Sequence, residues 1–222
     1  MNEQKVSTNA DVINALHHMF RHFCTHLKLE LPEPVFSLIP NRSSRAGYLG
    51  WFAQGSWKDQ NVNTEQDPNG THVRSEINIA ADKLDRPLMD IAETVLHEMA
   101  HYKNNVDNVS DCNRNQYHNM KFKKTAESMG MDVTKMGRYG YAHTVLNEEA
   151  KVWVQKYISE HLEGKNPFVL SRMGPRSKTT TAWRERHKTV LVKKEIFEAL
   201  EEDGVSSVKN LVEDLLLKYL DK

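Results

Sequence analysis

The sequence has few cysteines and no long apolar run. Cys24 and Cys112 are its only cysteines in 222 residues; they are too few for a disulfide framework and form no Cys-x-x-Cys pair. No stretch approaches the roughly 20 apolar residues of a membrane-spanning helix, and the polar N-terminus has no apolar signal-peptide core. We therefore expect a protein of the reducing cytoplasm that does not contact membranes.

An excess of charge of either sign is also missing. The chain carries 30 Lys and Arg against 30 Asp and Glu, so its formal net charge is zero. This balance argues against a global basic field that would attract nucleic acid, although local basic patches remain compatible with it. The length and the 39% hydrophobic content predict one globular domain with its own core, plus a small appendage.

The order of helical and extended patterns predicts an α+β fold. Apolar residues recur at helical spacing over residues 11–28, and two strand-like segments at 46–58 and 74–80 are joined by a loop with a strong turn signal. We expect these strands to form a small antiparallel sheet packed on helices. Further helices are expected at 85–105 with Asp85 as its cap, at 120–130 ending at Gly130, and at 147–162.

The helix predicted over 85–105 contains the sequence HEMAH at residues 97–101. At about 100° per residue, His97 and His101 lie roughly 40° apart on one helix face. Two such imidazoles can bind one tetrahedral zinc ion and leave positions for a third ligand and a water. Glu98 lies beside that water and could take its proton. The alternative is a polar helix face that carries two histidines by chance.

A third ligand has two candidates farther along the chain. No histidine occurs between His101 and His118, which excludes a third histidine six residues after the motif. His118 follows a polar loop long enough to fold back onto the helix, and Glu127 lies one to two turns into the next helix. We favour His118, with Glu127 as the competitor.

The segments "INIAADKL", "ETVLHEMAHY", "YHNMKFK" and "GRYGYAHT" occur in this order along the chain. Over residues 11–162 this set resembles the SprT-like metalloprotease domain, which includes bacterial SprT and eukaryotic Spartan. The resemblance implies a zincin-like fold with one catalytic Zn²⁺ bound by His97, His101 and His118. It also implies that Glu98 is the general base and acid, and that the substrates are proteins bound or crosslinked to DNA.

Peptide hydrolysis needs a donor for the developing oxyanion. Tyr139, Tyr141 and His143, in the glycine-containing segment 137–144, are the candidates for this role or for substrate contact; packing is the alternative for each. The strand at 74–80 could pair with an extended substrate chain if it forms an open sheet edge. A row of three histidines at positions 18, 22 and 26 is predicted to be a solvated helix face rather than a second metal site.

The C-terminal part of the chain departs from the SprT-like pattern. Many members carry a cysteine-rich zinc ribbon there, and this chain has no cysteine after Cys112. Disorder is expected for residues 1–10, a metalloprotease domain for 11–162, a basic linker for 163–187 and a small helical tail for 188–222. Candidate nucleic-acid contacts in the linker are Arg172, Arg176, Lys178, Trp183, Arg184 and Arg186.

The tail has the order strand, helix, glycine-containing turn, helix, which is similar to a ribbon-helix-helix module. Such a module would supply a dimer contact and DNA affinity, whereas packing of the two helices on the main domain is the alternative. We expect a cytoplasmic zinc endopeptidase, nucleoid-associated if it acts on DNA-bound proteins. The alternatives are a DNA-binding or transcription-associated protein with a structural metal domain, and a general zinc peptidase without DNA dependence.

Overall fold

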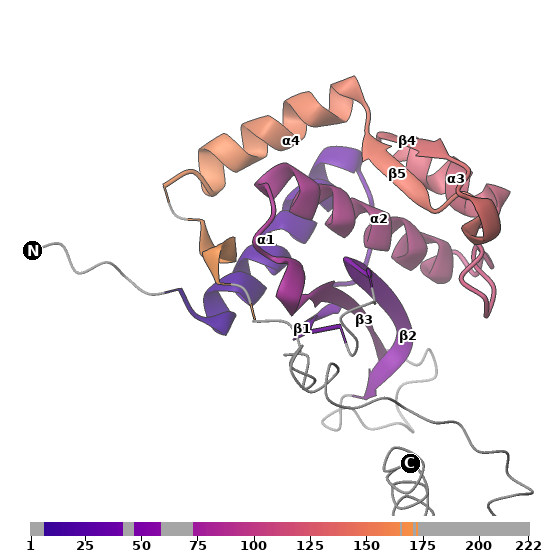
Figure 1. The fold of residues 1–222 in the computed structure, drawn as a ribbon, viewed down its shortest axis with the longest axis horizontal. Coiled ribbons are helices and arrows are strands. Elements are labelled where there is room, and N and C mark those ends of the chain that lie inside the picture. Colours follow the sequence, from indigo (N-terminus) through magenta and orange to yellow (C-terminus); the bar gives the residue numbers. More distant parts are fainter. Residues whose placement is uncertain (1–6, 42–46, 59–72, 165, 171, 173–222) are drawn as a thin grey trace, which may run out of the picture. The chain divides into compact units, whose positions relative to one another are not determined.

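A computed structural model describes residues 7–41, 47–58, 73–164, 166–170 and 172 (Figure 1). The predicted tail at 188–222 and most of the basic linker predicted at 163–187 lie outside these residues. The described part is α+β, as predicted. None of its helices is both long and apolar enough to cross a bilayer.

Helix α1 (Asn9–Leu27) begins inside the segment predicted to be disordered. Thr8 caps it: its side chain accepts a hydrogen bond from the backbone of Asp11, and the Asp11 carboxylate accepts one from the backbone of Thr8. This reciprocal capping box satisfies two backbone donors and fixes the start of the helix. The face of α1 that contains Leu16 and Phe20 is fully buried in the core.

The main sheet has three strands in the order β1-β3-β2. Strand β2 (Gly50–Lys58) runs antiparallel to β3 (Val73–Ala80), which confirms the predicted pair. Strand β1 (Val35–Ile39) pairs with the other side of β3 in parallel, so the sheet is mixed and the prediction of an antiparallel sheet was wrong. The 74–80 strand is therefore central rather than an open edge. The order of strands in a sheet depends on pairing between segments far apart in the chain. The local alternation of apolar and polar residues does not specify that pairing.

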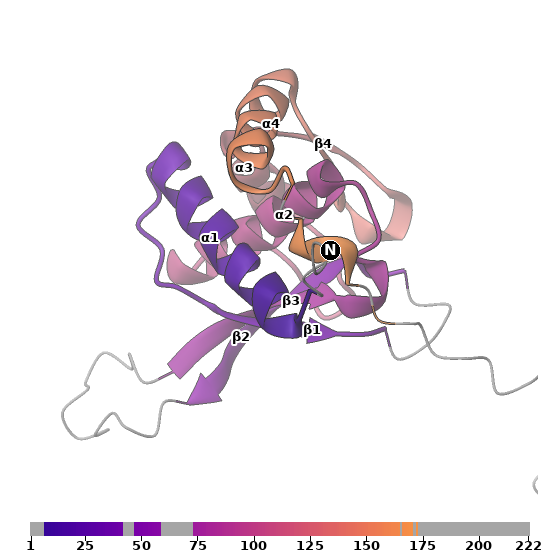
Figure 2. The same ribbon diagram turned by 90° about the vertical axis from the view of Figure 1, so that its left-hand side faces the viewer.

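Helix α2 (Leu88–Val106) lies across one face of this sheet beside α1 (Figures 1 and 2). It begins three residues later than predicted, and Arg86 in the preceding segment donates a hydrogen bond to the carbonyl of Lys83. Pro87, not Asp85, occupies the N-cap position. Leu96 and Ala100 are fully buried, so α2 is enclosed on more sides than the single apolar face that its sequence indicates.

Four further elements cover the other side of α2. They are α3 (Met120–Ser128), a hairpin of β4 (Met131–Thr134) and β5 (His143–Leu146), and α4 (Glu148–His161). Gly130 has a φ of +89° and lies so close to α4 that an added Cβ would be 2.9 Å from Cβ of Ala150. The glycine predicted to end α3 therefore also permits close packing against α4.

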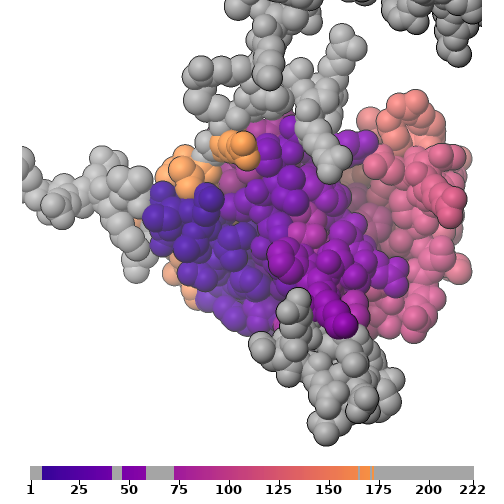
Figure 3. Space-filling model, turned by 90° about the horizontal axis from the view of Figure 1, so that it is seen from below, coloured from indigo at the N-terminus to yellow at the C-terminus, as the bar shows by residue number. Residues whose placement is uncertain are grey.

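The histidine row of α1 runs beside α4; His18 and His26 are exposed, as predicted for a solvated face, and His22 is half-buried. The ring of His22 lies 4.7 Å from the ring of Tyr157, and His26 stacks on Trp153 at 4.4 Å. These rings pack on α4 because Trp153 and Tyr157 give it an aromatic face toward α1. From below, Figure 3 shows the strand residues in purple between α1 in indigo and the residues after α2 in pink.

Candidate metal centre

Three histidines converge between α2 and the loop that precedes α3. His97 and His101 come from successive turns of α2, and His118 lies just before Asn119, the N-cap of α3. Ligand atoms of the three side chains all lie within 4.8 Å of one another. In the described part of the chain they form the only such group of three or more histidines, cysteines or carboxylates. The competitor Glu127 is outside it and pairs with Lys123 at 3.5 Å.

The Nδ1 atom of each of these imidazoles has an oxygen partner. Nδ1 of His97 lies 3.0 Å from the hydroxyl of Thr144, and Nδ1 of His101 lies 2.8 Å from the carboxylate of Asp111. Nδ1 of His118 lies 3.0 Å from the backbone carbonyl of Gln116. Such partners fix ring orientation and tautomer, which leaves Nε2 as the free ligand atom of each ring.

The three rings converge on one another. Nε2 of His101 is 3.0 Å from Nε2 of His118, and the ring of His97 lies 5.2 and 5.3 Å from these two rings. Phe122, which is fully buried, contacts all three rings with centroid separations of 4.4 to 4.8 Å. Three convergent imidazole nitrogens fit a divalent transition metal such as zinc.

The backbone of His118 is held by the segment that follows β4. Its N–H donates to the carbonyl of Tyr139 at 2.9 Å, and its carbonyl accepts from the N–H of Tyr141 at 3.0 Å. Between them, Gly140 has a φ of +66°, and a Cβ there would lie 2.2 Å from the carbonyl oxygen of His118. Only glycine permits this approach, so Gly140 helps to place the third histidine.

The protonation states suit metal binding. Burial, followed by the charges of His101 and His118, lowers the pKa of His97 well below its usual value. Burial and the charge of His101 likewise lower the pKa of His118. Both rings are therefore neutral at neutral pH, as a metal ligand must be.

Glu98 is nearly inaccessible, with 4% of its surface exposed. Burial raises the pKa of its carboxyl to about 7, against the lowering effects of His101 and of a hydrogen bond from the backbone of Phe52 in β2. A carboxyl with a pKa near neutrality can both accept and return a proton. A bound divalent cation would lower this pKa by its own charge.

Asp111 is a functional residue that the sequence prediction missed. Besides His101, its carboxylate accepts a hydrogen bond from the Asn104 side chain at 2.9 Å. Burial pushes the pKa of Asp111 up, but its interactions with His101 and Asn104 outweigh this and leave the pKa below its usual value. The sequence shows Asp111 only as an acidic residue in the polar loop between the HEMAH motif and His118. No local feature of the sequence distinguishes it from the neighbouring Asp107.

The three predicted oxyanion or substrate residues have different positions. Tyr139 and Tyr141 flank His118 through the backbone hydrogen bonds described above. His143 begins β5 and is exposed. Because side chains alternate along a strand, the neighbouring Thr144 faces the metal centre and His143 points away from it. Arg172 is exposed, and its N–H donates to the carbonyl of Ala81; Arg176, Lys178, Trp183, Arg184 and Arg186 lie outside the described residues.

Comparisons with known proteins give no relative: no protein-family model matches the chain, and searches of curated proteins and of solved structures find no match. The chemistry therefore has to be inferred from the centre itself. Three oriented imidazoles can hold one metal ion, and an adjacent buried carboxylate can exchange a proton with a molecule at that ion.

Proposed function

We propose that the protein is a zinc-dependent endopeptidase with a zincin-like arrangement of its catalytic residues. The observation that carries this proposal is the convergence of three imidazoles, each with its Nδ1 in contact with an oxygen, next to the buried Glu98. A purely structural metal site has no need of a neighbouring carboxylate with a pKa near neutrality. This favours a catalytic role over the structural alternative.

Zinc bound by the three histidines would supply a Lewis acid that polarises the scissile carbonyl and lowers the pKa of water. Glu98 takes the proton from the attacking water and passes it to the leaving amine. Asp111 holds His101 in the tautomer whose Nε2 faces the metal, and it stabilises positive charge on that ring. The backbone of β2 near Phe52 holds the carboxylate of Glu98 in position.

The substrate in this proposal is an extended protein chain that pairs with β2. Strand β2 is an edge of the sheet within the described residues, and its Gly50 lies directly over α2. A Cβ on Gly50 would be 3.2 Å from Cγ of Glu98. A peptide added along β2 would thus lie beside the catalytic carboxylate, held by backbone hydrogen bonds.

Proteins bound or crosslinked to DNA are the proposed natural substrates. Support comes from the resemblance of the residue pattern to SprT-like proteases and from the basic residues at 165–194. That segment has nine Lys and Arg against one acidic residue, Glu185. Such a segment can bind the phosphate backbone and keep a protease near proteins attached to DNA.

One assay tests both parts of the proposal. Zinc-loaded protein and its Glu98→Gln variant are incubated with a DNA-binding protein, with and without single-stranded DNA. We expect cleavage only by the unmodified protein and faster cleavage when DNA is present. Equal cleavage by both forms would remove Glu98 from the reaction. Cleavage that needs Glu98 but ignores DNA would leave a general peptidase.

A further inference from the structure

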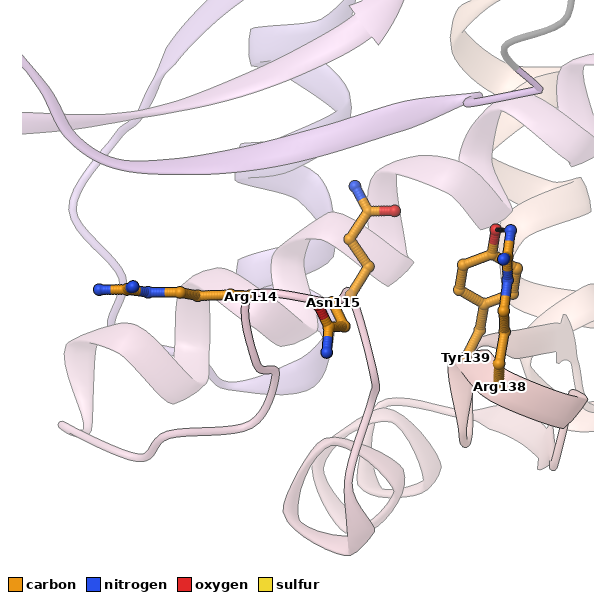
Figure 4. A pocket seen from close by; sticks show the side chains of 5 residues that line it. Arg114, Asn115, Arg138 and Tyr139 are labelled. Carbon is orange, nitrogen blue, oxygen red and sulfur yellow. Dashed lines mark hydrogen bonds between the residues drawn. The ribbon is translucent and has the colours of Figure 1, made fainter.

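A polar groove of about 460 Å³ opens beside the candidate metal centre. Two segments line it: the loop before His118 contributes Arg114, Asn115 and Gln116, and the turn before Gly140 contributes Arg138 and Tyr139 (Figure 4). Its size falls in the range of small-ligand sites. Its lining contains two cations and no carboxylate.

The groove is tied to the third histidine by direct contacts. The carbonyl of Gln116 contacts Nδ1 of His118, and the carbonyl of Tyr139 accepts the His118 N–H. Each of the two lining segments therefore contacts His118, a candidate metal ligand, directly. A peptide whose scissile bond lies at the metal would place a neighbouring side chain within reach of this groove.

The groove presents hydrogen-bond donors to that side chain. Figure 4 shows Arg138 beside the ring of Tyr139; its guanidinium lies 4.8 Å from the ring centroid and donates to the Tyr139 hydroxyl at 2.6 Å. A guanidinium has five N–H donors, so others remain available. The side-chain oxygen of Gln116 accepts a hydrogen bond from Tyr48 at 3.1 Å, which leaves its amide N–H groups to donate.

The positive charge of the groove is not neutralised locally. Within the described part of the chain, neither Arg114 nor Arg138 forms an ion pair with a carboxylate. Arg138 is held against Tyr139, and an arginine fork restrained in this way is suited to bind a carboxylate through two parallel hydrogen bonds. Arg114 points away from this pair in Figure 4, so its contribution is to the field at the mouth of the groove.

We propose that this groove is a substrate subsite that selects an acidic side chain, Asp or Glu, close to the scissile bond, with Arg138 making the direct contact. This inference rests on the proposed peptidase function and adds to it the sequence preference of the substrate.

Peptide binding tests the subsite without any need for turnover. The probes are short fluorescent peptides that share one sequence except for a single Glu, which is placed at a different position in each peptide. Each Glu peptide has a partner in which Gln replaces that Glu. They are titrated by anisotropy into full-length, zinc-loaded Glu98→Gln protein. At one position we expect the Glu peptide to bind about tenfold more tightly than its Gln partner, the size typical of a charge-assisted hydrogen bond.

Adding Arg138→Gln to this protein should bring the affinity ratio close to one, and Arg114→Gln should lower it less. The matched control is Lys124→Gln, which removes an exposed positive charge from α3 outside the groove and should leave the ratio intact. Arg138→Glu should reverse the preference toward a Lys peptide. Equal binding of Glu and Gln peptides at every position, or a ratio that survives Arg138→Gln, would overturn the proposal.

Two further outcomes separate this proposal from others. If a single-stranded oligonucleotide loses affinity on Arg138→Gln while the Glu-to-Gln ratio does not change, the groove binds phosphate and the acidic subsite is wrong. If Glu98-dependent hydrolysis occurs without Glu preference in binding, the peptidase function stands and the subsite fails. Glu preference without any hydrolysis would leave a site that binds acidic peptides, and would refute both the peptidase and its substrate subsite.

Discussion

Two groups of three histidines in the described part of the chain differ in what holds the rings. In the metal centre, rings 4.8 to 5.3 Å apart each contact an oxygen through Nδ1. Between α1 and α4, His161 lies 4.8 Å from His18 and 5.5 Å from His22, which is nearly the same spacing. Of these two groups only the first has ligand atoms that all lie within 4.8 Å of one another.

The difference lies in the partners rather than in the histidines. All three rings of the second group pack on the ring of Tyr157, and His18 directs Nδ1 to the Tyr157 hydroxyl at 3.0 Å. A carboxylate of Glu160 lies 4.0 Å from Nε2 of His161, whereas the Asp111 carboxylate lies 2.8 Å from Nδ1 of His101. Clustered imidazoles therefore become a metal site when oxygen partners turn one nitrogen of each ring toward a common point. The following predictions test this comparison.

The largest effect is expected when a histidine of the candidate metal centre is removed, in comparison with removal of a histidine from the second group. His118→Ala should reduce the zinc content after dialysis from about one ion per chain to near zero, because two histidines on one helix leave the tetrahedral site incomplete. His161→Ala should leave the zinc content unchanged. Mass spectrometry of the metal content of both purified variants measures the difference. Loss of zinc in His161→Ala would mean that the second group also binds metal.

A smaller effect is expected from changing an oxygen partner while keeping every ring. Asp111→Asn should weaken zinc binding by about 10- to 100-fold, since the partner of a ligating histidine sets its orientation and basicity. The matched change is Tyr157→Phe, which removes the hydroxyl that contacts His18 and should not alter zinc affinity. Competition with a chromophoric chelator gives both affinities. An unaltered affinity in Asp111→Asn would show that orientation by this carboxylate is dispensable.

The sequence specified the parts of the centre that depend on local geometry. Helical spacing alone places His97 and His101 on one face, and the polar loop before His118 is long enough to bring it back. Asp111 and Thr144 could not be found in this way, because they reach the centre through a loop conformation and through strand β5. The order of the main sheet also escaped prediction, because β1 pairs in parallel with β3 and makes it the central strand.

The backbone that carries His118 offers a third test. Gly140→Ala should destabilise the fold by roughly 3 kcal/mol, because the new Cβ meets the His118 carbonyl oxygen in a left-handed conformation. Gly137 also has a positive φ, +44°, but a Cβ there would have nothing within 4 Å, so Gly137→Ala should cost only about 1 kcal/mol. Urea unfolding of the metal-free proteins measures both. Equal losses would imply that the close approach at Gly140 is easily relieved.

The smallest effect concerns the pH response of the second group. Burial, followed by the charge of His161, lowers the pKa of both His18 and His22. Arg21 lowers the pKa of His18 further. His18 and His26 lower the pKa of His22 further, and Glu160 opposes them. An imidazole whose folded-state pKa lies below its unfolded value of 6.5 binds more protons when unfolded. Stability is therefore complete above about pH 6.5 and falls as the pH drops below it.

The double variant His18→Gln, His22→Gln should accordingly lose less stability than the parent protein between about pH 7 and pH 5. Both proteins are unfolded in urea with a chelator present, so that His97 and His118, whose pKa values are also lowered, contribute equally to each curve. His26→Gln serves as the control on the same helix. If the two curves stay parallel, the rings against α4 are solvated enough to protonate freely in the folded protein, and the metal centre alone accounts for the pH response.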